Sequence, residues 1–191
     1  MNHQDDHQLI KAIRAGQTQA YATLVKRYER MVFSLALRIM KNREDAEEVA
    51  QDVFVKAYQA LDGFKGDAKF SSWLYRITYN RSLDMLARKK RQPTFKNMEN
   101  MAQVNSSQIE NMLDTMEYQQ QQKLLKNAIN QLEAEEIFIV TVYYYKEHTI
   151  AEIAEMTGLT ESNVKIKLYR SRKKLFTLLQ AMPAFNKKEL L

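Results

Sequence analysis

Apolar residues recur at intervals of three and four along most of this chain, which is the spacing of one helix face. In the first half this pattern predicts four helices separated by short polar connections. The expected bounds are a first helix stopped by Gly16, a second over residues 18–40, a third from Glu44 to Gly63, and a fourth capped by Ser71 or Ser72 and ending before Pro93. Helical spacing returns at Lys123.

One run departs from this pattern. Residues 137–145 are nearly all β-branched or aromatic, and by propensity alone they are typical of a strand. An isolated strand would have no sheet to join, because 4 Gly and 2 Pro leave little material for the turns of a β-architecture. We therefore predict a helix here and an all-α fold.

The composition changes between the two halves. Residues 93–122 are rich in Asn, Gln, Met and Ser, with sparse apolar positions, although the end of this segment could belong to the next helix. We expect two small helical domains, residues 1–92 and 123–191, joined by a flexible linker over residues 93–122. The extreme amino terminus, with His3 and His7, is expected to be loose.

The second half contains a helix-turn-helix pattern. Thr149 and Glu152 match a capping box, Gly158 closes the short helix that follows, and Thr160 is available to cap a longer one. A short helix, a glycine-containing turn and a longer helix make up this motif.

The outer face of the longer helix carries small polar groups first and cations afterwards. Residues 165–174 hold six basic residues among ten and no acid. That order suits a recognition helix whose first turns enter the major groove while later cations neutralise phosphates. The alternative is a solvated face whose cations complement the helix dipole, but six cations exceed what capping requires, so we favour DNA contact.

The third helix has an acidic side on which Asp45, Glu48 and Asp52 align. Like charges at this spacing repel weakly, so a solvated face remains an alternative to a surface for a basic protein partner. The three acids could hold magnesium only if they faced a cavity.

The fourth helix interleaves aromatic residues with cations. Unpaired bases stack on aromatic rings while cations hold the backbone, so this pattern is typical of single-stranded DNA binding. For Trp73, with Phe70, Leu74 and Ile77 nearby, a place in the core is an equal alternative.

Charge and composition narrow the classes of function. The formal net charge of +6 favours a polyanionic partner. There is no Cys, no glycine-rich phosphate loop and no convincing metal-ligand cluster, so we expect no catalytic residue, metal or cofactor. No apolar run approaches a membrane span, and MNHQDDHQLI does not resemble a leader, so we expect a cytoplasmic protein without membrane insertion of its own.

Two blocks of the sequence resemble a known family. The segment that contains DAEEVAQDVF and FSSWLYRI resembles region two of bacterial sigma factors of the extracytoplasmic-function group, and the helix-turn-helix block resembles their region four. The resemblance covers most of residues 9–179. It implies a non-enzymatic protein that joins core RNA polymerase, directs it to a two-element promoter and stabilises the opened minus-ten strand.

The resemblance also implies a role for individual positions. The surface for the β′ clamp helices of polymerase comprises Asp45, Glu48, Gln51, Asp52 and Phe54. The minus-ten contacts, in a base-capturing loop over residues 64–70 and the helix after it, comprise Lys65, Asp67, Lys69, Phe70, Trp73, Arg76, Asn80, Arg81, Arg88 and Lys89. The minus-thirty-five contacts comprise Thr160, Ser162, Asn163, Lys165, Lys167, Arg170, Arg172 and Lys173.

Two points depart from or extend this comparison. Housekeeping sigma factors carry paired tryptophans where this chain has Trp73 and Leu74, which implies weaker promoter melting. The resemblance also implies contact with the polymerase β flap and an anti-sigma factor as a candidate partner. A helix-turn-helix regulator that acts without core polymerase is the main alternative function, and a nuclease is a second, less supported one.

Overall fold

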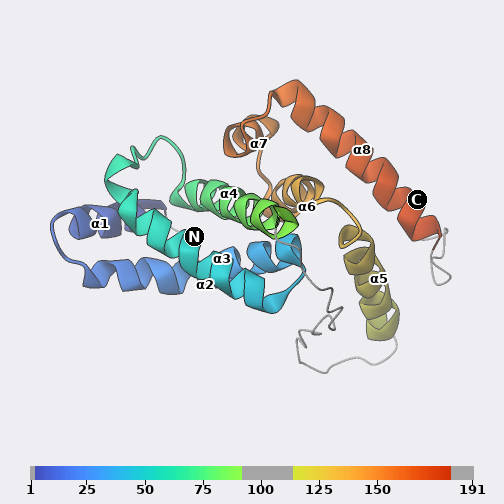
Figure 1. The fold of residues 1–191 in the computed structure, drawn as a ribbon, viewed down its shortest axis with the longest axis horizontal. Coiled ribbons are helices and arrows are strands. Elements are labelled where there is room, and N and C mark those ends of the chain that lie inside the picture. Colours follow the sequence, from blue (N-terminus) through green and yellow to red (C-terminus); the bar gives the residue numbers. More distant parts are fainter. Residues whose placement is uncertain (1–2, 92–113, 182–191) are drawn as a thin grey trace.

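The computed structural model describes residues 3–91 and 114–181, and within these ranges the chain forms helices and no strand (Figure 1). The predicted all-α fold is confirmed. Most of the predicted linker, residues 93–113, lies outside the described residues, whereas residues 114–122 belong to the first helix of the second half.

The helices of the first half are α1 (His3–Arg14), α2 (Gln19–Met40), α3 (Arg43–Gln59) and α4 (Phe70–Arg91), with a short 3₁₀ turn at Leu61–Gly63. The second half contains α5 (Asp114–Ile129), α6 (Ala134–Val140), a π-helical turn (Thr141–Tyr145), α7 (Ile150–Thr157) and α8 (Glu161–Gln180).

The predicted apolar stripes form the core of the first half. Helix α2 buries Leu24, Tyr28 and Val32 along one side, and α3 packs against it through Val49 and Val53. Most of the remaining positions of α2 and α3 are exposed or partly exposed, as expected for amphipathic helices that cover a shared core.

Two predicted helix boundaries are wrong. Helix α4 begins at Phe70, because the Trp73 backbone N–H donates to the Lys69 carbonyl at 3.1 Å and closes a turn before the expected serine cap. Ser72 lies buried inside the helix instead. Helix α3 ends at Gln59, and Gly63 instead ends the 3₁₀ turn that follows.

The strand-like run at residues 137–145 is helical, as predicted. It forms α6 and the π-helical turn, and residues 137–142 are all buried. Burial of these β-branched and aromatic side chains outweighs their weak preference for extended backbone.

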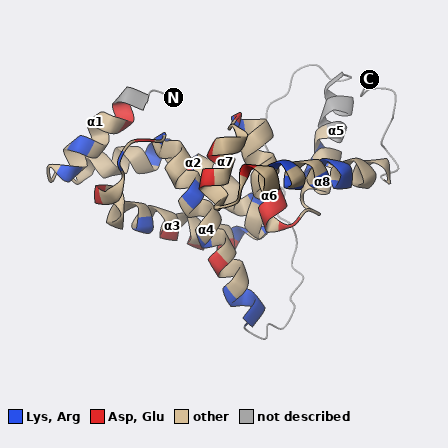
Figure 2. Cartoon of the chain, turned by 90° about the horizontal axis from the view of Figure 1, so that it is seen from above, with Lys and Arg blue, Asp and Glu red and all other residues tan. Residues whose placement is uncertain are grey.

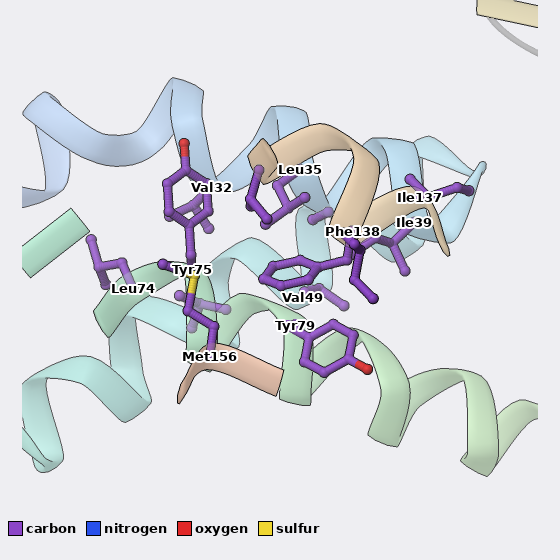
Figure 3. Close-up of a cluster of buried hydrophobic side chains, with 14 of the residues drawn as sticks. Val32, Leu35, Ile39, Val49, Leu74, Tyr75, Tyr79, Ile137, Phe138 and Met156 are labelled. Carbon is purple, nitrogen blue, oxygen red and sulfur yellow. The ribbon is translucent and has the colours of Figure 1, made fainter. Parts of the chain in front are cut away.

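The two halves share buried contacts. Side chains from α2, α3, α4, α6 and α7 converge on one cluster (Figure 3). Within it the Tyr79 ring of α4 lies 4.4 Å from the Phe138 ring of α6, and the Tyr75 ring lies 5.5 Å from that of His148. Lys41 adds a polar contact, because its Nζ donates to the Leu132 carbonyl at 3.0 Å. The two predicted helical domains are therefore present, and they pack against each other through these contacts.

The expectation of a loose amino terminus is wrong from residue 3 onward. Helix α1 is anchored by Asp6, which is 5% exposed and accepts hydrogen bonds from Arg27 at 2.5 Å and from the Tyr28 hydroxyl. Burial, together with the Asp6 carboxylate, raises the pKa of Tyr28 well above its ordinary value. A buried carboxylate paired in this way is a specific tertiary contact, so α1 is part of the fold.

None of the helices within residues 3–91 and 114–181 combines the length and apolar character needed to cross a bilayer.

Candidate nucleic-acid interface

The helix-turn-helix has the predicted caps. The Glu152 backbone N–H donates to Thr149 Oγ1 at 3.2 Å, and the Thr149 backbone N–H donates to Glu152 Oε2 at 2.8 Å. Gly158 ends α7 with a φ of 74°, a left-handed conformation that favours glycine. Thr160 then begins α8 by accepting from the Asn163 N–H at 3.3 Å. The Thr160 hydroxyl thus serves as the cap of α8.

Helix α8 has one buried and one exposed face. Its buried residues are Val164, Leu168, Ser171 and Leu175, while most of the predicted DNA-contacting residues are exposed. Lys and Arg gather along α8 and at the carboxyl end of α4 (Figure 2). The exposed members of the predicted set on α8 are Ser162, Asn163, Lys165, Arg170, Arg172 and Lys173.

Some cations of α8 are held by groups near α6. Lys167 pairs with Glu135, and Lys174 Nζ lies 2.9 Å from Glu136 Oε2. The Arg172 guanidinium lies 5.9 Å and 5.6 Å from the ring centroids of Tyr143 and Tyr144. Within the described part of the chain, Lys165, Arg170 and Lys173 make no ion pair, so they are the cations of α8 most available to a partner.

The acidic side of α3 faces the basic side of α4 in a ladder of ion pairs. Asp52 pairs with Arg81, Glu48 Oε1 lies 2.7 Å from Arg88 Nη2, and Asp45 Oδ1 lies 2.5 Å from Lys89 Nζ. The ladder explains how three like charges share one side of α3, since α4 supplies a cation to each. Residues predicted to bind polymerase and residues predicted to bind DNA are therefore paired with each other.

The other members of the polymerase set differ in exposure. Gln51 is exposed beside the ladder, whereas Phe54 is half-buried and its carbonyl accepts from the Tyr21 hydroxyl at 2.5 Å. Burial raises the pKa of Tyr21 to about 12. These contacts hold the amino-terminal part of α2 against α3.

The loop between the 3₁₀ turn and α4 has an exposed middle and buried ends. Lys65, Asp67 and Lys69 are exposed, whereas Phe64 is 7% exposed and Phe70 only 2%. Phe70 packs edge-on against Tyr28, with centroids 5.5 Å apart. The structure therefore places Phe70 in the core, where its ring anchors the loop, and we leave it out of the proposed DNA-contacting set.

Trp73 lies at the edge of the core. It is half-buried, and its ring lies tilted against Phe64 and Phe70 at centroid distances of 5.2 and 5.5 Å. Arg76 and Asn80 lie further along α4 and are exposed. The loop and the first turns of α4 thus present polar and cationic groups around one partly exposed indole.

Helix α1 supports this loop, which the sequence did not predict. The Arg14 guanidinium donates to the carbonyls of Leu61 and Phe64 at 2.7 and 2.5 Å, and to that of Asp62 at 3.2 Å. The only available signal was an arginine just before Gly16, which is equally typical of a solvated helix end.

A second contact joins α1 to the loop at Gly66. Gly66 has a φ of 85°, and a Cβ at this position would lie 2.7 Å from His7 Cε1. The backbone conformation therefore favours glycine, and a larger residue would also require the exposed His7 ring to move.

Among residues 3–91 and 114–181, no group of three or more His, Asp or Glu side chains is placed to hold a metal ion.

The described residues thus present two separate candidate DNA-binding surfaces on a helical protein. One is the exposed cationic helix of the helix-turn-helix, and the other is the loop before α4 together with the partly exposed ring of Trp73 and the neighbouring cations. Two sigma-70 models match the chain in this order, region 2 over residues 24–92 and region 4 over residues 122–175.

Whole-chain relatives agree with these matches. The chain is 31% identical to the ECF RNA polymerase sigma factor SigM of Mycobacterium tuberculosis over 93% of its own length and 86% of that protein. It is 28% identical to SigW of Bacillus subtilis over 87% of its own length and 92% of that protein. The chain belongs to the extracytoplasmic-function group of the sigma-70 family.

The fold agrees as well. The sigma factor RpoE of Bartonella quintana, solved in complex with the anti-sigma factor NepR, matches with a TM-score of 0.66 and 18% identity over 84% of this chain and 97% of that one.

Proposed function

We propose that this protein binds core RNA polymerase and directs it to promoters with a minus-ten and a minus-thirty-five element. Region 2 and region 4 matches in one chain, in the order of a sigma factor, are the observation that carries the proposal. In this proposal residues 1–92 bind polymerase and the minus-ten strand, and residues 123–191 bind the minus-thirty-five duplex and the β flap. The protein contributes binding and no covalent chemistry.

The minus-ten surface consists of the exposed part of the loop and the adjoining side of α4. Lys65, Asp67 and Lys69 are exposed on a loop whose ends are fixed by buried aromatic residues, so their backbone is held in one place. Trp73 provides a partly exposed ring for an unstacked base, and Arg76 and Asn80 lie along the path of the strand.

The ion-pair ladder gives the proposed mechanism an ordered step. Basic residues of polymerase that bind Asp45, Glu48 and Asp52 would replace the α4 cations as their partners. Arg81, Arg88 and Lys89 would then be released toward the DNA backbone. Polymerase would bind the acids that compete with DNA for the α4 cations, and DNA would bind the cations that compete with polymerase for the acids. Each binding event therefore favours the other.

The minus-thirty-five surface is the exposed face of α8. Ser162, Asn163 and Lys165 lie in its first turns, nearest to base edges if the amino end enters the groove. Arg170 and Lys173 lie further along, where phosphates would approach.

We also propose an anti-sigma factor as a regulatory partner, and a cytoplasmic location, where the bacterial chromosome and polymerase lie. The Bartonella relative was solved with such a partner, and the exposed cations of both halves would suit an acidic inhibitor.

The decisive experiment is transcription in vitro with core polymerase, the purified chain and fragments of a genomic library. The expected result is a set of transcripts that require the chain and share two spaced upstream elements. Stable DNA binding without any effect of the chain on polymerase would instead favour the alternative, a helix-turn-helix regulator that acts independently of core polymerase.

A further inference from the structure

Helix α8 exposes an apolar surface among its cations, at positions that helical spacing already places opposite the buried stripe. Ile166 is 47% exposed and Tyr169 is 65% exposed, although the helix has a buried face for apolar residues. Val164, Leu168 and Leu175 occupy that buried face at 0, 2 and 9% exposure. Ile166 lies two positions from both Val164 and Leu168, and so points away from the core at 100° per residue.

The two exposed residues are neighbours on the helix. Residues three apart share a face, so Ile166 and Tyr169 form one continuous apolar strip near the amino end of α8. Lys165, Arg170 and Lys173 surround this strip, are exposed, and make no ion pair within the described part of the chain.

An apolar strip bordered by cations fits duplex DNA better than it fits an apolar protein surface. The cations favour a polyanion, which argues against a second apolar protein surface. In the major groove of duplex DNA, the thymine C5-methyl is the apolar group that a helix meets between the phosphate rows. A polyanion with apolar groups at the floor of its groove matches both features of the strip.

We propose that Ile166 reads a thymine in the minus-thirty-five duplex by packing on its C5-methyl, and that Tyr169 extends the same contact one turn further along the groove. This inference rests on the proposed function and adds a specificity-determining residue to it. Lys165, Asn163 and Ser162 read polar edges, and Ile166 adds selection for a methyl group that hydrogen bonds cannot supply.

The test compares thymine with uracil in promoter fragments bound by the polymerase holoenzyme. Each thymine of the minus-thirty-five element is replaced in turn by deoxyuridine, which removes only the methyl group. At one position the replacement should weaken binding of the wild-type holoenzyme about fourfold, the value of roughly one buried methyl group.

The variant Ile166→Ala should bind the thymine promoter more weakly and lose this uracil effect, whereas Ile166→Val should retain it. Phe176→Ala provides a matched control, because Phe176 is 49% exposed on the same helix but lies ten residues away. It should leave the uracil effect unchanged. Ile166 is exposed, so the variants should fold normally, which thermal unfolding checks.

Several results would overturn the inference. Equal uracil effects in wild type and Ile166→Ala, no uracil effect at any position, or a selected element without an A·T pair would each do so. If Ile166→Ala weakens assembly with polymerase in the absence of DNA and leaves promoter choice unchanged, the strip binds protein. If the holoenzyme binds no promoter at all, the proposed function fails first and this inference fails with it.

Discussion

At the scale of single residues, Arg14 connects the amino-terminal helix to the proposed base-capturing loop. The Arg14 guanidinium donates hydrogen bonds to the backbone carbonyls of Leu61, Asp62 and Phe64. These carbonyls lie in the short 3₁₀ turn and directly after it. We infer that α1 fixes the position of the loop, although the helix and the loop are far apart in the sequence. Its role would be to position the loop and not to touch the DNA.

Replacing Arg14 by Ala should therefore loosen the loop. Hydrogen bonds from a charged donor contribute roughly 1.5–3 kcal/mol each, so we expect a loss of about 2 kcal/mol or more in the free energy of unfolding. Discrimination between minus-ten sequences should fall as well, measured by transcription from a set of promoter variants.

The control for this prediction is Lys11→Ala, which removes an exposed cation from the same helix and should change neither property. Unaltered stability and promoter choice in Arg14→Ala would mean that α1 does not hold the loop.

Glu152 determines part of the pH dependence of the fold. Its carboxylate accepts from the Thr149 backbone N–H, and this bond, more than the nearby Thr149 hydroxyl and His148, holds the pKa of Glu152 below its ordinary value of 4.5. A carboxyl with a lowered pKa in the folded state stabilises the fold above its unfolded pKa, and this stabilisation is lost as the pH falls through the folded pKa.

The variant Glu152→Gln should thus be less stable than wild type near neutral pH, and the difference should shrink below pH 4.5. Urea unfolding at several pH values measures this. Glu155→Gln, an exposed change on the same helix, is the control and should show no such convergence. A difference that stays constant down to the acid limit would contradict the capping role of the carboxylate.

At the scale of elements, the ladder between α3 and α4 raises the question of whether its acids hold the helices together or bind polymerase. A charge exchange separates the two roles. The double variant Glu48→Arg with Arg88→Glu keeps an ion pair at that rung but reverses its direction.

We expect this double variant to unfold at nearly the same temperature as wild type but to bind core polymerase much more weakly in the absence of DNA. The loss follows because a positive charge would now face the basic surface of the partner. Native polymerase affinity in a folded double variant would move the polymerase surface elsewhere.

At the scale of the whole molecule, the two halves share buried aromatic contacts. Tyr79 is 2% and Phe138 0% exposed, and their rings lie 4.4 Å apart across the boundary between region 2 and region 4. Burial raises the pKa of Tyr79 well above its ordinary value, and the Glu135 carboxylate, which accepts from its hydroxyl at 3.1 Å, adds to the shift. The contact is therefore both apolar and polar.

A double-mutant cycle tests this packing in solution. We expect Tyr79→Leu and Phe138→Leu to be coupled by about 0.5–1.5 kcal/mol in the free energy of unfolding, the range for an aromatic pair in contact. The pair Tyr21 and Tyr58, at 4.9 Å within the first half, serves as a positive control. A coupling near zero for the first pair alone would show that the halves separate in solution.

Much of the fold and part of the site could be predicted from sequence. The stripes of α2 and α3 and the caps at Thr149, Gly158 and Thr160 are local patterns, and each depends on residues only a few positions apart. The helical assignment of residues 137–145 is also correct, but for a different reason, because the overall composition outweighed a local pattern typical of a strand.

Other features depend on contacts that no local pattern encodes. Phe70 belongs to the core because Tyr28 and Phe64 reach it from other parts of the chain. Asp6 is buried because α2 brings Arg27 and Tyr28 to its carboxylate from more than twenty positions away. The start of α4 was misplaced because serine caps are common but not obligatory.

The sequence by itself determined the helices, the helix-turn-helix and the family, because periodicity, caps and motif order are properties of neighbouring residues. Only the tertiary structure decided which charges are free and which are paired. Asp45 and Lys89 lie 44 positions apart, and their pairing follows from the packing of α3 on α4. Helical spacing already turns Ile166 away from the buried stripe of α8, but only the structure shows that no other described part of the chain covers it.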